Sequence, residues 1–523
     1  MSLRVTCRSA NIAEDADMRD VQLPWSPTSA ILKVGRHLSD WVFPKPGDML
    51  QRPSCFYSLQ QWSTTDQHHT FLASYSGAPS STYPDLDDID MDSTIYHHDP
   101  KHLNQLPPEI LGEIFLYYLQ ATEGAPTPTG RTFGNVSAYD GATTSPITLS
   151  HVCSYWRSLS LSTPTLWSTI SVSLPTPHDI PILETWLSRS MDLPLELLVA
   201  QGLGMGSVIQ QIVQMFIKEK HRWKRIHLQL DSGCEHLFSD LDTTPFALLE
   251  EVGLDLMQWS QQAVSGICRS FYSSRKLKII RFGKSWDQDA QLFHAPLEQL
   301  NFLELNYLSG PQLFPLLCRM PNLRGLAIAF LEGPVEINVT GPLTLPYLQA
   351  LSVGMVEDTS PILRNLRLPA LARLRLYQGF GRHADIDTAG RILCTHLLES
   401  GSALQSLHCG ELGDHEKTLN EMLASPVISH LTDLIVESRV TDSTLRTLTH
   451  QSSTRILPKL KSISLWEVRS STPATFFSMV QSRRRFSDTL KSVHGVIHHS
   501  SRTGMEMPWI PGVGLDIDYY YAQ

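Results

Sequence analysis

Leucines and other large apolar residues recur at a regular spacing through the second half of the chain. Each copy has the form L-x-x-L-x-L, and its last three positions alternate as they do in a strand with one buried face. The copies are Leu249-Val252-Leu254, Leu277-Ile280-Phe282, Leu297-Leu300-Phe302, Leu323-Leu326-Ile328, Leu348-Leu351-Val353, Leu371-Leu374-Leu376, Leu404-Leu407-Cys409, Leu431-Leu434-Val436 and Leu460-Ile463-Leu465. Ile226, Leu228 and Leu230 suggest an opening strand, and Leu490-Val493 a degenerate last copy.

The spacing of these copies, roughly 20 to 33 residues, is near the period of leucine-rich repeats. One such unit cannot bury its own apolar face, whereas stacked units share a continuous core and form one long parallel sheet. We therefore predict an α/β leucine-rich-repeat solenoid over residues 231–500, a horseshoe with the parallel sheet on its concave side. The horseshoe should be irregular, because the asparagine that usually follows each strand is mostly missing.

A helical spacing of apolar residues precedes the repeats. One helix should begin at the pair Pro107-Pro108, since proline is tolerated in the first turn, and carry Ile110, Leu111, Ile114, Phe115 and Tyr118 on one face. A second should begin at Ser145-Pro146 and carry Leu149, Val152, Cys153, Trp156 and Leu159. Thr163-Pro164 announces a third short turn, followed by Leu166 and Trp167. So small a unit cannot bury all of this apolar surface alone, and we expect part of it to meet a partner.

These helical segments, LPPEILGEIF and LSHVCSYWRSLSLSTPTLWSTI, resemble an F-box, in the variant of the expanded family of mushroom-type (basidiomycete) fungi. The later segments LETWLSRSMDLPLELLV and HRWKRIHLQL resemble the same family. The resemblance implies a small all-α, three-helix F-box that docks onto the Skp-type adaptor of a cullin-RING (SCF) ubiquitin ligase. It places the adaptor contact on Leu106, Pro107, Pro108, Ile110, Leu111, Ile114, Phe115, Leu149, Val152, Cys153, Trp156 and Leu159.

The composition of the remaining segments completes the predicted domain organisation. Residues 1–100 are poor in periodic apolar positions and end in the acidic run YPDLDDIDMD (83–92), so we predict a largely disordered tail. The F-box spans 101–174, with a flexible insertion at 120–144 that is rich in Gly, Pro, Thr and Ser. Residues 175–230 link it to the repeats and include the first repeat-like units, and 501–523 form a cap or tail.

Two local patterns admit a ligand-binding interpretation that we do not favour. Gly202, Gly204 and Gly206 follow a predicted strand at 194–200, but Ser207 occupies the position of the third glycine in a dinucleotide-binding loop. Asp88, Asp90, Asp92 and Asp99 have calcium-loop spacing, but Ser93 stands where the turn needs glycine.

Composition excludes several functional classes. The net charge of −10 argues against a general nucleic-acid binder. No apolar run reaches the ~20 residues that span a membrane, and the first residues have no secretory apolar core. The eight cysteines are scattered without a C-x-x-C motif, which favours reduced thiols and an intracellular protein of the cytoplasm, the nucleus or both.

The chain carries no recognisable catalytic motif, and we expect neither a catalytic residue, a cofactor nor a metal site. The pairs His68-His69, His97-His98 and His498-His499 lack ligand partners at metal spacing. The run Arg483-Arg484-Arg485 should form a solvated face. A less favoured interpretation is a contact with an anion or a nuclear import signal. The F-box resemblance implies a non-catalytic receptor that binds the adaptor and holds a target protein on the repeat sheet. The alternative is a protein-binding scaffold in which the helices only cap the repeats.

Overall fold

The computed structural model describes residues 106–121, 136–138, 145–201, 206–239, 241, 246–283, 294–337, 341–356, 360–378, 386–410, 416–450, 456–469, 473–486, 489–498 and 516–522. The predicted tail at 1–100, most of the insertion at 120–144 and the segment 501–515 lie outside these residues.

One large sheet runs through the whole described part of the chain. Its strands follow one another in sequence order, and each pair is parallel except the first, β1 with β2. The strands are β1 (Val136–Ser137), β2 (Thr169–Ser173), β3 (Leu195–Ala200), β4 (Trp223–Asp231), β5 (Glu251–Met257), β6 (Ile279–Phe282), β7 (Phe302–Ser309), β8 (Gly325–Glu332), β10 (Ala350–Val356), β12 (Arg373–Gln378), β13 (Ser406–Cys409), β14 (Asp433–Thr441), β15 (Ser462–Arg469), β16 (Ser492–His498) and β17 (Asp516–Ala522). A separate pair joins β9 (Leu343–Thr344) to β11 (Leu366–Arg367). The predicted α/β fold with a long parallel sheet is thus confirmed.

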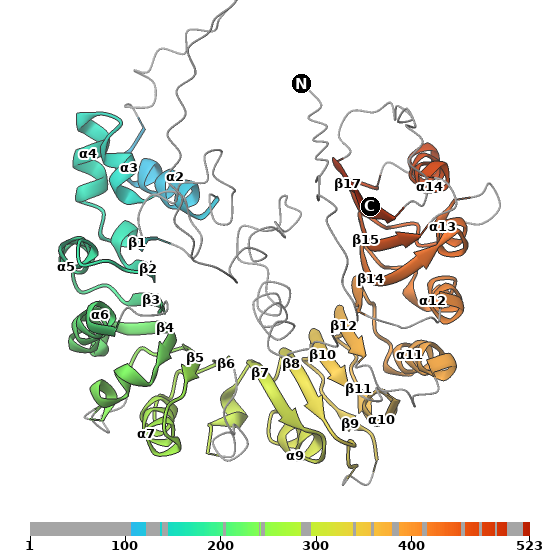
Figure 1. Cartoon of the computed structure of the whole chain (residues 1–523), viewed down its shortest axis with the longest axis horizontal. Coiled ribbons are helices and arrows are strands. Elements are labelled where there is room, and N and C mark those ends of the chain that lie inside the picture. Colours follow the sequence, from blue (N-terminus) through green and yellow to red (C-terminus); the bar gives the residue numbers. More distant parts are fainter. Residues whose placement is uncertain are drawn as a thin grey trace, which may run out of the picture.

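The helices lie on the outer side of this sheet, which curves as an open arc (Figure 1). They are α5 (Asp179–Arg189), α6 (Gly206–Lys218), α7 (Gln261–Tyr272), α9 (Leu313–Cys318), α10 (Ser360–Asn365), α11 (Ile386–Ser400), α12 (Glu416–Leu423), α13 (Asp442–Leu448) and α14 (Pro473–Phe486). Short 3-10 turns are η2 (Pro164–Trp167), η3 (Lys220–Arg222), η4 (Ser232–Phe238), η5 (Leu297–Gln299), η6 (Gly310–Gln312) and η7 (Pro426–Ile428). We call the side of the sheet that faces away from these helices the concave face.

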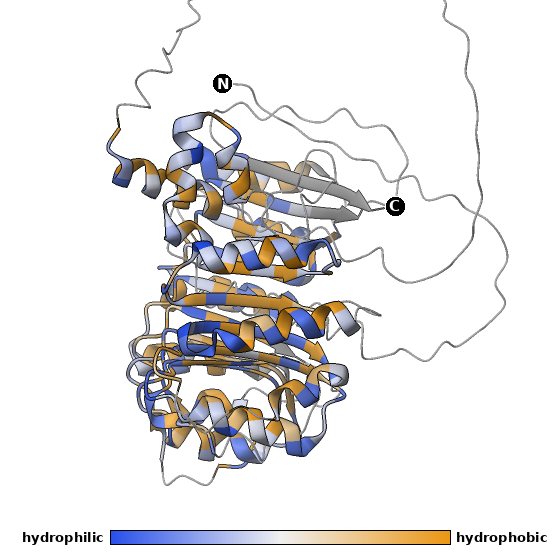
Figure 2. Ribbon diagram, turned by 90° about the vertical axis from the view of Figure 1, so that its left-hand side faces the viewer, coloured by the Kyte–Doolittle hydropathy of each residue, from blue (hydrophilic) through white to orange (hydrophobic). Residues whose placement is uncertain are grey.

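Strand register follows the leucine pattern from unit to unit. Ile226 pairs with Val252, Val252 with Ile280, and the same repeat position continues through Leu326, Leu351, Leu374, Leu407, Leu434, Ile463 and Val493. These side chains are buried in one continuous core between sheet and helices. Burial of each removes a large apolar side chain from water, worth at most about 1.5–3 kcal/mol. Seen from the side, the helices facing the viewer mix hydrophilic and hydrophobic positions, as helices with one buried face do (Figure 2).

One predicted copy was placed three residues too early. The sequence suggested Leu297-Leu300-Phe302, but β7 begins at Phe302, and Leu303 pairs with Ile280 and Leu326. The copy is therefore Leu300-Leu303-Leu305. Leu297 instead begins the turn η5 and is also buried. Because both alignments bury leucines, the spacing alone could not show whether the copy begins at Leu297 or at Leu300.

The sheet extends beyond the predicted repeats at both ends. The strand expected at 194–200 is β3, and together with β2 it continues the same parallel sheet toward the N-terminus. At the other end, β17 pairs in parallel with β16 along its whole length. Within the insertion, Val136–Ser137 forms β1, and the side chains of Val136 and Ala138 are buried. This part of the insertion therefore differs from the flexible loop that we expected.

The predicted helical segment contains α2 (Pro108–Ala121), α3 (Pro146–Ser150), α4 (Ser154–Leu161) and η2. The second predicted helix is two helices, because the chain turns at residues 151–153. Cys153 is extended and its sulfur accepts a hydrogen bond from the Trp156 amide at 3.4 Å, which caps α4. The Trp167 indole donates to the Ser160 carbonyl at 2.8 Å and meets Trp186 of α5 edge-on, so the helices and the start of the sheet share one core.

The arginine run on α14 does not form the solvated face that we predicted. Arg483 is buried and donates to the backbone carbonyls of Leu448, Ile456 and Leu457 at 2.7–3.3 Å. Burial lowers the pKa of its guanidinium to about 10, so it stays charged at neutral pH. Arg485 remains exposed. The buried arginine satisfies carbonyls that would otherwise lack partners where α13 meets the next turn.

Candidate functional site

Helix α2 divides the predicted adaptor-binding residues into two groups. Leu111, Phe115 and Leu119 recur every fourth residue and are fully buried. One position earlier along the helix, Ile110 and Ile114 keep 50% and 42% of their surface exposed. The first row holds the helix on the fold, and only the second is open to a partner without rearrangement.

The other predicted contact residues divide in the same way. Pro107, Pro108 and Val152 are exposed, with Val152 at 59% in the turn between α3 and α4. Leu149 is buried, and Leu106, Cys153, Trp156 and Leu159 are half-buried. Trp156 packs its ring 4.7 Å from that of Phe115, which joins α4 to α2. The indole thus lies partly in the core and partly at the surface.

Two tyrosines belong to the exposed row but were not among the predicted contacts. Tyr117 and Tyr118 are exposed and follow Ile110 and Ile114 at the spacing of one helical face. Their helical spacing from Ile110 and Ile114 is the sequence signal that could have identified both tyrosines as exposed. We call Ile110, Ile114, Tyr117 and Tyr118 the α2 stripe.

The concave face carries a charged network at its N-terminal half. The Glu251 carboxylate of β5 receives Arg281 Nε at 2.8 Å and lies 3.0 Å from His227 Nε2, and Arg281 Nη1 reaches Glu304 at 2.7 Å. Burial would raise the pKa of Glu251, but the His227 hydrogen bond and the Arg281 charge outweigh it and hold that pKa at about 2. Gly253 leaves the space that His227 needs, because a Cβ there would lie 2.9 Å from its ring.

The C-terminal half of the same face carries a different charged group. His408 Nε2 lies 2.6 Å from a Glu437 carboxylate oxygen, and Arg375 is close by on β12. Burial raises the pKa of Glu437 to about 7, opposed in part by Arg375, whose own pKa burial lowers to about 10. Both halves of this face therefore contain charged groups that are largely buried and paired with one another.

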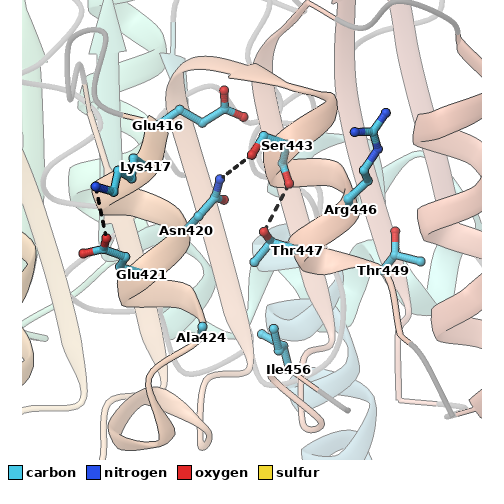
Figure 3. A pocket seen from close by; sticks show the side chains of 10 residues that line it. All are labelled: Glu416, Lys417, Asn420, Glu421, Ala424, Ser443, Arg446, Thr447, Thr449 and Ile456. Carbon is cyan, nitrogen blue, oxygen red and sulfur yellow. Dashed lines mark hydrogen bonds and ion pairs between the residues drawn. The ribbon is translucent and has the colours of Figure 1, made fainter. Parts of the chain in front are cut away.

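A groove with a volume of about 690 Å³ lies on the outer side, between α12 and α13 (Figure 3). One of its two acidic residues, Glu416, accepts hydrogen bonds from the backbone and hydroxyl groups of Thr441 and Thr444, so it anchors the N-terminus of α13. Asn420 Nδ2 donates to Ser443 Oγ at 3.0 Å. These side chains are engaged in joining two helices, and they do not form a nucleophile with a general base.

The three buried cysteines among the described residues, Cys234, Cys268 and Cys409, are poorly suited to nucleophilic chemistry. Burial raises the pKa of Cys234 to about 11 and those of Cys268 and Cys409 to about 12, so these thiols stay protonated at neutral pH. Among the described residues, no group of His, Cys, Asp and Glu is arranged to hold a metal ion. None of the described helices has the length and apolar character needed to span a bilayer.

Comparison with known proteins adds little to this description. No protein-family model matches the sequence, and no curated protein matches it. Among solved structures, a protein of Bacteroides fragilis is similar over 65% of this chain and 88% of its own, with 14% identity and a TM-score of 0.33. A likeness this low supports no conclusion about fold or function.

Proposed function

We propose that this chain is a non-catalytic substrate-recognition subunit of an SCF-type (cullin-RING) ubiquitin ligase, located in the cytoplasm, the nucleus or both. In this proposal α2, α3, α4 and η2 are an F-box that binds a Skp-type adaptor. The strand array is an irregular leucine-rich-repeat solenoid whose concave face binds a target protein. Ubiquitin transfer takes place on other subunits, and this chain contributes by raising the local concentration of target lysines.

The observation that carries the proposal is the α2 stripe. Isoleucines with about half of their surface in water are unfavourable on a monomer, and grouped on one helical face they indicate a protein contact. Protein interfaces draw most of their energy from a few such apolar anchors. The F-box resemblance places the exposed Val152 and the proline pair at the start of α2 in the same contact.

The array supports the second half of the proposal. Its stacked units present one continuous sheet face, and that face carries charged and hydrogen-bonding side chains at both halves. A long, polar, concave surface suits recognition of a folded protein or an extended segment better than of a small molecule.

Co-expression of the full chain with a fungal Skp-type adaptor, followed by size-exclusion chromatography, tests the proposal. We expect a one-to-one complex, and we expect Ile114→Ala to weaken it by about 2 kcal/mol, roughly 30-fold in Kd. Leu398→Ala on α11 is the matched control, because Leu398 is even more exposed but lies far along the array. Separate elution of two folded proteins, or equal effects of the two variants, would contradict the proposal.

A second candidate function is a binding scaffold in which the helices only cap the sheet. The observation that favours it is β1, which ties the insertion between α2 and α3 to the first parallel strand. Under this reading Ile114→Ala leaves every interaction of the chain unchanged, and a target of the concave face binds without any adaptor.

A further inference from the structure

The concave face is open to solvent near the C-terminal end of the arc, at β14 and β15 (Figure 1). Buried and partly exposed residues alternate along β14, and Ile435 and Arg439 belong to the row that faces away from the core. Trp466 and Arg469 of β15 lie on the same side. The side chains of Arg439 and Arg469 are 46% and 51% exposed. We call Ile435, Arg439, Trp466, Glu467 and Arg469 the C-terminal patch.

Two arginines share one carboxylate in this patch. Arg439 is in register with Glu467 and donates to its Oε1 through Nε at 3.3 Å. Arg469 donates to the same oxygen through Nε and Nη2, each at 2.8 Å. Among the described residues, the two Nη groups of Arg439 have no acceptor. The group therefore has one more positive charge than negative charge, and it retains donors that a ligand can use.

The excess positive charge runs against the composition of the chain, which has 52 acidic and 42 basic residues. Exposed ion pairs of this kind contribute at most about 1 kcal/mol to stability, so the fold gains little from a second arginine on Glu467. A guanidinium with unused Nη donors matches a carboxylate, which accepts two parallel hydrogen bonds. The charge of the C-terminal patch is thus complementary to an acidic group on a partner.

An aromatic side chain lies beside the two arginines. Trp466 is half-buried, and its ring centroid is 5.9 Å from that of His494 on β16. The pairing of β15 with β16 shifts register between Leu465 and Val468, and such irregularities often occur beside functional sites because they redirect side chains. Tryptophan and arginine are also the residue types that most often dominate the energy of a protein interface.

The spacing of these side chains fits an extended segment of a partner. Trp466 and Arg469 are three positions apart on β15, or about 10 Å at 3.3 Å per residue. An extended chain with an apolar residue and an acidic residue three positions apart covers the same distance. One such segment can therefore contact the indole and the guanidinium groups together.

We infer that the C-terminal patch binds an extended acidic segment of the target protein, with a carboxylate on Arg439 and Arg469 and an apolar side chain on Trp466. The inference rests on the proposed function in one respect, namely that the concave face holds the target. It assigns that contact to β14 and β15, whereas the charges around Glu251 are largely buried and paired with one another.

Fluorescence anisotropy with the full chain tests this inference. The probe is a short labelled peptide of glycine and serine that carries one leucine and, three positions later, two aspartates. We expect saturable binding that weakens about tenfold when asparagines replace the aspartates. Binding of the aspartate peptide should also weaken as salt is added, because salt screens a contact between exposed charges. No saturable binding, or equal binding of the two peptides, would overturn the inference.

Variants of the chain locate the contact. Arg439→Gln and Arg469→Gln should each weaken binding of the aspartate peptide about tenfold, and Trp466→Ala should weaken binding of both peptides. Arg446→Gln is the matched control, because Arg446 is exposed on α13, on the outer side of the sheet, and should leave binding unchanged. Circular dichroism verifies that each variant is folded. Unchanged binding in both patch arginine variants, or an equal loss in the Arg446 control, would overturn the inference.

Adaptor binding is measured separately, on the α2 stripe, so the two possible failures are distinguishable. A chain that binds the adaptor but does not discriminate between the two peptides would overturn this inference alone. A chain that binds the aspartate peptide through the C-terminal patch but elutes apart from the adaptor would support this inference and contradict the proposed ligase role.

Discussion

At the first helix, Ile110 and Ile114 are in contact with solvent, whereas in the sheet Glu251, Arg281 and Glu304 are mostly shielded from it. Both arrangements reverse the usual distribution of apolar and charged residues. The buried charges and the exposed isoleucines differ in whether other groups of the chain offset their unfavourable environment. Each buried charge of the network at Glu251 has ion-pair partners within the chain, while the exposed isoleucines have no such compensation on their own surface. The buried charges therefore belong to the fold, and the exposed isoleucines indicate a partner.

The largest expected effect separates the two rows of α2. Phe115→Ala should reduce the free energy of unfolding by about 3–5 kcal/mol, because it opens a cavity where the ring packs on Trp156. Ile114→Ala, one residue earlier, should change it by no more than about 0.5 kcal/mol. Urea denaturation of the two variants measures both values. Similar losses would mean that the stripe is part of the core and that the comparison drawn above is wrong.

An intermediate effect is expected from the buried carboxylate of Glu251. Its pKa is about 2 in the folded chain and 4.5 in the unfolded one, so it stabilises the fold above pH 4.5 by at most about 3 kcal/mol. This contribution is lost as pH falls from about 4.5 to about 2. The Glu251→Gln variant should therefore lose less unfolding free energy than the unmodified chain as pH falls through that range. Thermal unfolding at a series of pH values measures this difference. The exposed Glu421→Gln on α12 is the control and should leave the profile unchanged.

The smallest of the three effects concerns Arg483. Arg483→Met keeps the length of the side chain but leaves the carbonyls of Leu448, Ile456 and Leu457 without their donors. We expect a loss of about 1–3 kcal/mol, with faster hydrogen exchange confined to α13 and α14. The neighbouring Arg485→Met, on an exposed position, should have no measurable effect. A stable Arg483 variant would show that this buried charge does not support the fold.

Most strands of the array could be predicted from the sequence, because each unit repeats the same alternation and must bury the same face. The prediction was wrong at Leu297-Leu300-Phe302, because two further leucines, Leu303 and Leu305, made a copy starting at Leu300 equally apolar. β2 was not assigned to the repeats, since Trp167 stands where the pattern has its leading leucine. The break at Cys153 was missed because an apolar spacing continues across it.

The candidate site was harder to predict than the fold. A helical wheel placed Ile110, Leu111, Ile114 and Phe115 on one broad face, and only the position of α4 decides which of them are covered. Likewise, nothing in the sequence distinguishes Arg483 from its neighbours Arg484 and Arg485, because its burial depends on carbonyl groups that are 26 to 35 residues away.

The short strand β1 has a consequence for how molecules of this protein behave toward one another. A parallel sheet ends in an open row of amide and carbonyl groups, and such an edge can recruit a strand from another molecule and start aggregation. Two residues of the insertion, Val136 and Ser137, run antiparallel to β2 and occupy this edge. The segment between α2 and α3 thus also covers part of the β2 edge, where a strand of another molecule could otherwise pair.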